Sequence, residues 1–124
     1  MDKLSAADLT IDVGQAEAGQ PLRVTWLGKS ADRSPATILA PWFEKLLAEA
    51  KAGATVVEMH FERLEHFNSS TITALIRLIQ NARNAGVRLV MVYDQNLKWQ
   101  RLSFDALRVF EKGDDLFQLK AAQP

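Results

Sequence analysis

The segment at residues 87–93, VRLVMVY, is the sequence feature that most constrains the fold. It is a nearly continuous apolar run, which is typical of a central strand covered on both faces. A helical pattern of apolar residues precedes it at 72–79, and another follows it at 99–110. Strands that alternate with helices predict a mostly parallel sheet with right-handed crossovers.

The first thirty residues predict a β-hairpin. Apolar and polar residues alternate at 9–13 and again at 22–26, the period of half-buried strands. Residues 14–21 contain two glycines and a proline and predict the turn between them. Residues 28–34 are polar, so we expect a connecting loop there. An antiparallel hairpin beside parallel strands makes the predicted sheet a mixed one.

A first helix is predicted after this hairpin. Ser34 and Pro35 are a favourable cap and first-turn pair. Pro41 leaves two alternatives open, since it either kinks the helix or marks its true start. Gly53 stands where a left-handed residue commonly ends a helix.

The remaining elements alternate between strand and helix. Residues 55–61 are rich in β-branched side chains and predict a strand. Ser69 or Ser70 begins a helix that Gly86 ends. Residues 98–111 predict a third helix, and 116–119 a last short strand. The apolar stripe of the third helix is expected to consist of Trp99, Leu102, Ala106, Val109 and Phe110.

The predicted order is therefore β-β-α-β-α-β-α-β. This is an α/β fold with a mixed sheet of four to five strands and helices packed against it. A length of 124 residues predicts one domain over residues 1–124, with its core at about 9–119.

Composition argues against several classes of function. The 15 basic and 15 acidic side chains cancel, which disfavours general nucleic-acid binding and electrostatic membrane docking. The chain has no cysteine, which leaves out disulfides, thiolate metal sites and a cysteine nucleophile. No apolar run approaches the length of a membrane span or a signal peptide, so we expect a cytoplasmic protein.

The ionisable residues form no catalytic or metal-binding motif. His60 and His66 are six positions apart across a strand end, which is not the spacing of metal ligands on one helix. Glu58, Glu62 and Glu65 lie in a predicted strand and loop, where charged residues are usually solvated. No glycine pattern matches a nucleotide-binding loop. We therefore expect no enzymatic activity, no cofactor and no metal.

The most informative motif is Phe67-Asn68-Ser69-Ser70, which follows a strand and a short connector and opens a helix. Together with the predicted order of elements, it resembles the STAS family of anti-sigma-factor-antagonist-like domains over residues 9–119. Many members have aspartate at the position of Asn68 and glycine at that of Thr71. The Asn68 and Thr71-Ile72 pattern is more similar to a biofilm-regulatory branch, whose members control a diguanylate cyclase through a kinase and phosphatase pair.

The resemblance implies a non-enzymatic switch controlled by phosphorylation. In the family, the serine or threonine after the Asp or Asn is phosphorylated, and the matching residue is Ser69, with Ser70 as its nearest competitor. The implied partners are a histidine-kinase-like serine/threonine kinase or anti-sigma factor, a PP2C-type phosphatase and, for the biofilm branch, a diguanylate cyclase. The implied partner-binding residues are Arg63, Glu65, His66, Phe67, Asn68, Ser70, Thr71, Thr73, Arg77 and Gln80.

Two alternatives stay open. Asn68, Ser69 and Ser70 are all ordinary N-cap residues, so a purely structural role would also explain their presence. STAS-like domains also serve as constitutive scaffolds or accessory subunits of transport assemblies without phosphorylation.

Overall fold

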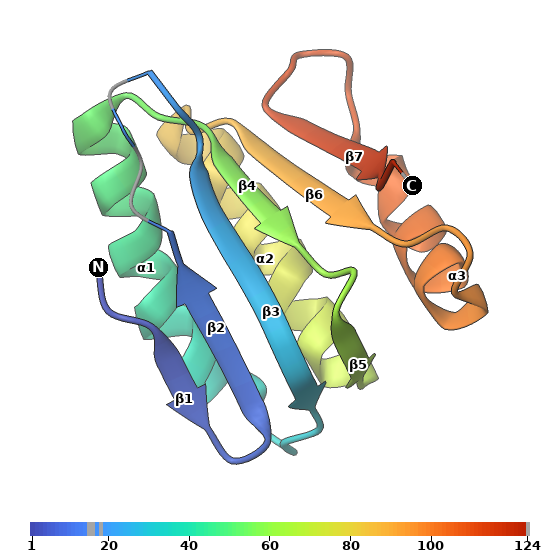
Figure 1. Ribbon diagram of the computed structural model, residues 1–124. Coiled ribbons are helices and arrows are strands. Elements are labelled where there is room, and N and C mark those ends of the chain that lie inside the picture. Colours follow the sequence, from blue (N-terminus) through green and yellow to red (C-terminus); the bar gives the residue numbers. More distant parts are fainter. Residues whose placement is uncertain (15–16, 18, 124) are drawn as a thin grey trace.

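The computed structural model describes residues 1–14, 17 and 19–123 (Figure 1). The predicted order β-β-α-β-α-β-α-β is confirmed by β2, β3, α1, β4, α2, β6, α3 and β7. The predicted turn at 14–21 lies partly outside the described residues. In chain order the elements are β1 (Leu4–Ala6), β2 (Leu9–Val13), β3 (Leu22–Ser30), α1 (Pro35–Gly53), β4 (Val57–His60), β5 (Leu64–Phe67), α2 (Ser69–Ala85), β6 (Leu89–Tyr93), α3 (Lys98–Leu107), the 3-10 helix η1 (Arg108–Phe110) and β7 (Phe117–Ala121).

The strands form one mixed sheet in the order β1-β2-β3-β4-β6-β7, with β5 paired to β3. β1, β2 and β3 are antiparallel, whereas β3, β4, β6 and β7 run parallel, as does β5 beside β3. Among the described residues the sheet has seven strands, more than the predicted four to five. The additional strands, β1 and β5, have only three and four residues, too few to show a period of two.

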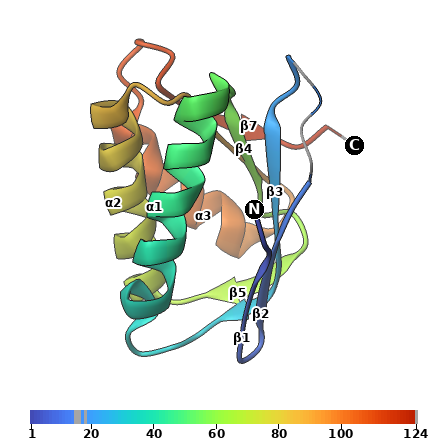
Figure 2. The same cartoon turned by 90° about the vertical axis from the view of Figure 1, so that its left-hand side faces the viewer.

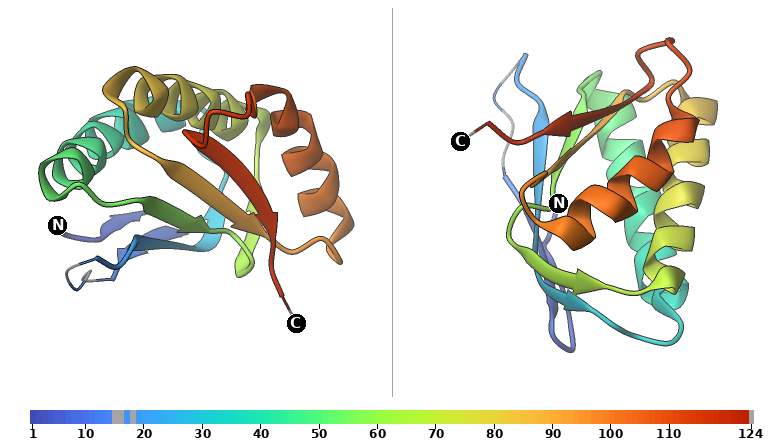
Figure 3. Two further views of the ribbon diagram at one scale, coloured as in Figure 1. Left: turned by 90° about the horizontal axis from the view of Figure 1, so that it is seen from above. Right: turned by 90° about the vertical axis from the view of Figure 1, so that its right-hand side faces the viewer.

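All three α-helices lie on one face of the sheet (Figures 2 and 3). The expectation that residues 87–93 are covered by elements on both faces is therefore wrong. Val90 and Val92 of β6 point away from the helical layer, yet each is only 8% exposed. Their register neighbours on β4 and β7 are long polar residues, Glu58 and Gln118 beside Val90, and His60 and Lys120 beside Val92. The carbon stems of such side chains can cover apolar neighbours.

The prediction of a loop over residues 28–34 is wrong for residues 28–30, because β3 continues to Ser30. Gly28 permits this continuation. Its φ is +85°, and a Cβ atom there would lie 2.0 Å from the carbonyl oxygen of Asp8. The strand shifts register between Gly28 and Lys29 and then pairs Ser30 with Phe67. The end of β3 thus lies beside the start of α2.

Helix α1 begins at Pro35, and Pro41 lies inside it, so of the two alternatives the earlier start is confirmed. The predicted end is displaced by one residue. Gly53 is the last helical residue, and Ala54 adopts the left-handed conformation with φ 50° and ψ 43°. Its backbone N–H donates to the carbonyls of Ala50 and Lys51. An alanine thus occupies a position that glycine would adopt with less strain.

The predicted apolar stripe of α3 is wrong for most of its members. Leu102 is 59% exposed and Val109 is 74% exposed, and Ala106 is exposed as well. The residues that α3 buries are Gln100, Phe104 and Leu107. The ring of Phe104 packs at centroid distances of 4.9 Å from Phe61 and 5.2 Å from Tyr93. Inward packing of Phe104 and of the Gln100 amide sets the orientation of this helix.

The C-terminal end of α2 is fixed by an ion pair between distant segments. The Arg83 Nε and Nη2 atoms donate to the two carboxylate oxygens of Asp114 at 2.9 and 3.1 Å, and Nη2 also donates to the Phe110 carbonyl at 3.1 Å. The hydrogen bond from Arg83 lowers the pKa of the Asp114 carboxyl from 3.8 to about 2. This two-pronged geometry attaches the segment between η1 and β7 to α2.

We predict that Ala54→Gly raises the free energy of unfolding by about 0.5–1 kcal/mol, because it removes the cost of a Cβ atom in the left-handed region. Chemical denaturation with urea measures this. Ala52→Gly is the matched control, two residues earlier and inside α1. It should lower the free energy of unfolding by about 0.5–1 kcal/mol. A loss of stability in both variants would contradict the assigned backbone conformation.

We also predict a pH dependence that originates at Asp114. Its folded pKa lies below 3.8, so the ion pair stabilises the fold above pH 4, and this contribution is lost as pH falls from about 4 towards 2. Carboxyl carbon NMR should place the Asp114 midpoint near 2. In Arg83→Gln the midpoint should return towards 3.8. An unchanged midpoint in that variant would refute the pairing.

Candidate functional site

The start of α2 is capped by Asn68. This residue has an extended backbone, with φ −92° and ψ 174°, and its Oδ1 accepts the backbone N–H of Thr71 at 2.9 Å. Its other polar groups bind the end of β3 and the following loop. The backbone N–H of Asn68 donates to the Ser30 carbonyl at 3.0 Å, and its Nδ2 donates to the Asp32 carbonyl at 2.8 Å. One asparagine thus joins α2 to the segment between β3 and α1.

A buried pair of hydroxyl groups continues this connection. Thr71 is fully buried, and its Oγ1 donates to Asn68 Oδ1 at 2.8 Å. Ser30, only 3% exposed, lies with its Oγ 2.7 Å from the same Thr71 oxygen. Since the Thr71 proton is directed to Asn68, the Ser30 hydroxyl is the donor between the two. The network therefore runs from Ser30 through Thr71 to Asn68.

Ser69 and Ser70 are the first two residues of α2, and both are exposed. The sequence left open whether Asn68, Ser69 or Ser70 caps the helix. The cap is Asn68, and neither serine has that role. Within the described part of the chain, the Ser69 hydroxyl has no hydrogen-bond partner. The backbone N–H groups of both serines precede the first helical hydrogen bonds, and they are unpaired among the described residues.

The electrostatics of this helix start favour an anion. α2 has 17 residues and no acidic side chain in its first turn. The unpaired N–H groups and the aligned peptide dipoles give the N-terminus a partial positive charge. A negatively charged group at Ser69 would therefore be accommodated without disrupting the helix.

Most of the predicted partner-binding residues lie on the exposed surfaces of α2 and β5. Ser70, Thr73, Arg77 and Gln80 are exposed at helical spacing along α2. The Thr73 hydroxyl donates back to the Ser69 carbonyl at 3.3 Å. On β5, which leads into the helix, Glu65 and His66 are exposed too.

Three of the predicted partner-binding residues do not fit that role. Phe67 is 4% exposed and Thr71 is 0% exposed, so these side chains support the surface instead of contacting a partner. The Phe67 ring packs edge-on against Trp99, at a centroid distance of 5.2 Å. Arg63 lines a shallow hollow together with His60 and Arg23 of the helix-free sheet face. For Phe67, the sequence did not show which face it takes, because β5 has only four residues.

Gln100 also supports the site and was not expected from the sequence. Its Nε2 donates to the carbonyls of Phe61 and Leu64 at 2.6 and 3.3 Å, and its Oε1 accepts the N–H of Asp94 at 2.8 Å. It pairs backbone groups at the break between β4 and β5, and so holds β5 in place before α2. The signal that could have indicated this role is a glutamine flanked by apolar positions on the same helix.

His60 lies between two carboxylates on the helix-free sheet face. Its Nε2 is 2.5 Å from Glu58, and its Nδ1 is 3.1 Å from Glu62. These partners satisfy both ring nitrogens, and His66 is elsewhere, 6.2 Å from the Trp99 ring. In the part of the chain that the structure describes, no three His, Cys, Asp or Glu residues are grouped to hold a metal ion. None of the described helices combines the length and apolar character needed to cross a membrane.

We predict that Thr71→Val lowers the free energy of unfolding by about 1–3 kcal/mol, because the isosteric change removes the hydroxyl that pairs with the buried Ser30 hydroxyl. Urea denaturation should show a lower midpoint with an unchanged slope. Thr73→Val is the exposed control on the same helix and should change stability by less than about 0.5 kcal/mol. Equal losses in both would argue against the buried network.

Comparison with known proteins bears on the fold. No protein-family model matches the chain, and no curated protein matches it. Among solved structures, it is similar to an uncharacterised protein of the DUF3478 family from Shewanella loihica PV-4, which has a SpoIIAA-like fold. The TM-score is 0.58 at 13% sequence identity, over 94% of this chain and 86% of that one. A likeness at this identity concerns the fold alone, and the chain has a SpoIIAA-like, that is STAS-like, fold.

Proposed function

We propose that this protein is a non-enzymatic partner-switching regulator whose binding is controlled by reversible phosphorylation of Ser69. The observation that carries the proposal is the division of roles at the start of α2. Asn68 takes the cap, and this leaves the Ser69 hydroxyl exposed and without a partner among the described residues. Modification of that hydroxyl would break no hydrogen bond of the fold.

Phosphorylation of Ser69 would change the local charge strongly. A phosphoserine carries about −1.5 to −2 charges at neutral pH, where serine carries none. The helix N-terminus would stabilise this charge, so the domain would keep its fold. The surface formed by Glu65, His66, Ser70 and Thr73 would, however, become more negative. An acidic or desolvated partner surface would then be repelled, because like charges across an interface cost several kcal/mol.

The partners in this proposal follow from the STAS resemblance. A histidine-kinase-like serine/threonine kinase or anti-sigma factor would bind the unmodified form and phosphorylate Ser69, and a PP2C-type phosphatase would restore it. A diguanylate cyclase as the regulated output is the finer version of the proposal, supported by the Asn68 and Thr71-Ile72 pattern.

The first experiment asks whether the modification exists. Mass spectrometry of the protein isolated from its native cell should find phosphate on the peptide that contains Ser69. The Ser69→Ala variant should lack it, whereas Ser70→Ala should retain it. Phosphate that persists in Ser69→Ala and disappears in Ser70→Ala would transfer the switch to Ser70. Absence of phosphate under all growth conditions, with a stable complex present, would favour a constitutive accessory subunit.

We predict that Ser69→Asp weakens binding to the partner without lowering the stability of the fold. Calorimetry with the kinase encoded by the same organism should show affinity reduced by about 10- to 100-fold, that is about 1.4–2.8 kcal/mol. The free energy of unfolding should stay equal or rise by about 0.3–1 kcal/mol, since an acidic residue in the first turn favours the helix. Ser69→Ala should bind like the wild type. Equal kinase affinity of the Asp and Ala variants would refute the proposal.

A further inference from the structure

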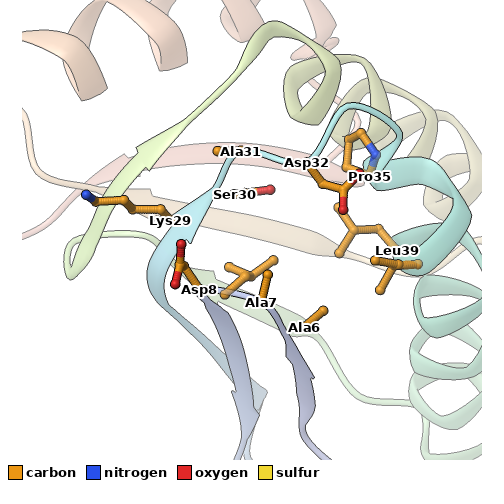
Figure 4. A pocket seen from close by; sticks show the side chains of 11 residues that line it. Ala6, Ala7, Asp8, Lys29, Ser30, Ala31, Asp32, Pro35 and Leu39 are labelled. Carbon is orange, nitrogen blue, oxygen red and sulfur yellow. The ribbon is translucent and has the colours of Figure 1, made fainter.

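A cavity of about 180 Å³ lies next to the segment that holds α2. Figure 4 shows that its lining comes from the β1–β2 turn, the end of β3 and the start of α1. The inner wall is apolar and consists of Ala6, Leu9, Pro35, Ile38 and Leu39. Ser30 is its one buried polar residue, and the hydroxyl of that residue already binds Thr71.

The hairpin side of the cavity includes two small residues, Ala6 and Ala7. Ala6 lies in β1 opposite Leu9, on the side of the strand that faces α1, and Ala7 follows it at the turn. A larger residue at position 6 would extend over Leu39 and fill the space. A dry apolar cavity of about 150 Å³ is known to take a benzene molecule, so a space of this size suits one phenyl-sized group.

The charges at the rim of the cavity indicate which kind of ligand it would accept. Asp8 and Asp32 bring two carboxylates, while Lys29 brings one ammonium group, which points away from Pro35 and Leu39 in Figure 4. This net negative rim disfavours phosphates, nucleotides and acidic lipid headgroups. It favours an apolar side chain that is accompanied by a basic residue.

The cavity and the proposed switch share one backbone segment. The Ser30 and Asp32 carbonyls accept from Asn68, the cap of the helix on which Ser69 lies. Both residues also line the cavity. A partner that contacts the surface around Ser69 could thus place a neighbouring side chain in the cavity. Buried anchors of this kind commonly carry much of the energy of an interface.

We infer that the cavity between the β1–β2 turn and α1 receives one apolar side chain of phenyl size, adjacent to a basic residue, from the protein partner. This inference rests on the proposed function and adds to it the partner's anchor. Alanine at position 6 then keeps a binding cavity open at the expense of tighter packing. Filling the cavity should stabilise the free protein and impair the complex.

The test uses the full chain with Ala6→Ile, and Ser5→Ile as the matched control on the opposite side of β1. Ala6→Ile should raise Tm by about 3 °C or more, because it fills a cavity. Kinase affinity by calorimetry should fall at least about tenfold in Ala6→Ile and remain near the wild-type value in Ser5→Ile. Should Ala6→Ile fail to fold, Ala6→Val provides the smaller change.

A second measurement is independent of the partner and of Ser69. Methyl NMR in benzene-saturated buffer should show shifts at Ala6, Leu9, Ile38 and Leu39 in the wild type and none in Ala6→Ile. Absence of these shifts would overturn the apolar cavity. Benzene binding combined with unchanged kinase affinity in Ala6→Ile would overturn the anchor, and would leave a cavity for small molecules. Equal binding by the Ser69 variants would refute only the switch, since the Ala6 comparison is made on the unmodified protein.

Discussion

The side chain of Asn68 is the contact on which the arrangement of the site depends. Its carbonyl oxygen caps α2, and its amide nitrogen reaches the loop after β3, so two segments 36 residues apart are held at a fixed distance. The buried Thr71 hydroxyl completes the connection by donating to the same oxygen. Because the cap is provided from outside the helix, the first helical residue needs no structural role of its own. The contacts of Asn68 would therefore stay in place if Ser69 gained a charge, as we propose.

This connection depends on the unusual end of β3. A strand that stopped at Trp26 would leave Ser30 in a loop, with no defined position for its carbonyl. Gly28 allows the strand to pass close to the Asp8 carbonyl and continue, and the register shift that follows pairs Ser30 with Phe67. Gln100 has a comparable role on the other side, where its amide donates to the Phe61 and Leu64 carbonyls at the break between β4 and β5. Gly28 and Gln100 thus each stabilise irregular backbone at the same end of the sheet.

The sequence predicted the order of elements because long segments have clear periods. The apolar run at 87–93 and the stripe from Ile72 to Ile79 identify β6 and α2 correctly. The sequence-based prediction failed where side-chain hydrogen bonds, and not apolar periodicity, determine which residues point inward. Gln100 turns inward and binds three backbone groups with its amide, and Leu102 and Val109 are exposed. Ala54 takes the left-handed position because α1 extends through Gly53. Neither outcome follows from hydrophobicity or propensity alone.

A chain selected only for stability would fill the space beside Ala6. Local rules are generally broken where function demands it, and the cost is small when the rest of the core is complete. Here Trp26, Phe61 and Phe104 are fully buried and pack ring against ring, so the sheet and helices are secured at their centre. Stability from this centre offsets the packing that is lost at the open cavity beside Ala6, near the end of the sheet where Asn68 lies. The exposed Ser69 hydroxyl costs no packing, because water can satisfy it. An open cavity and an exposed hydroxyl at one end of the sheet are what the proposed binding surface would require.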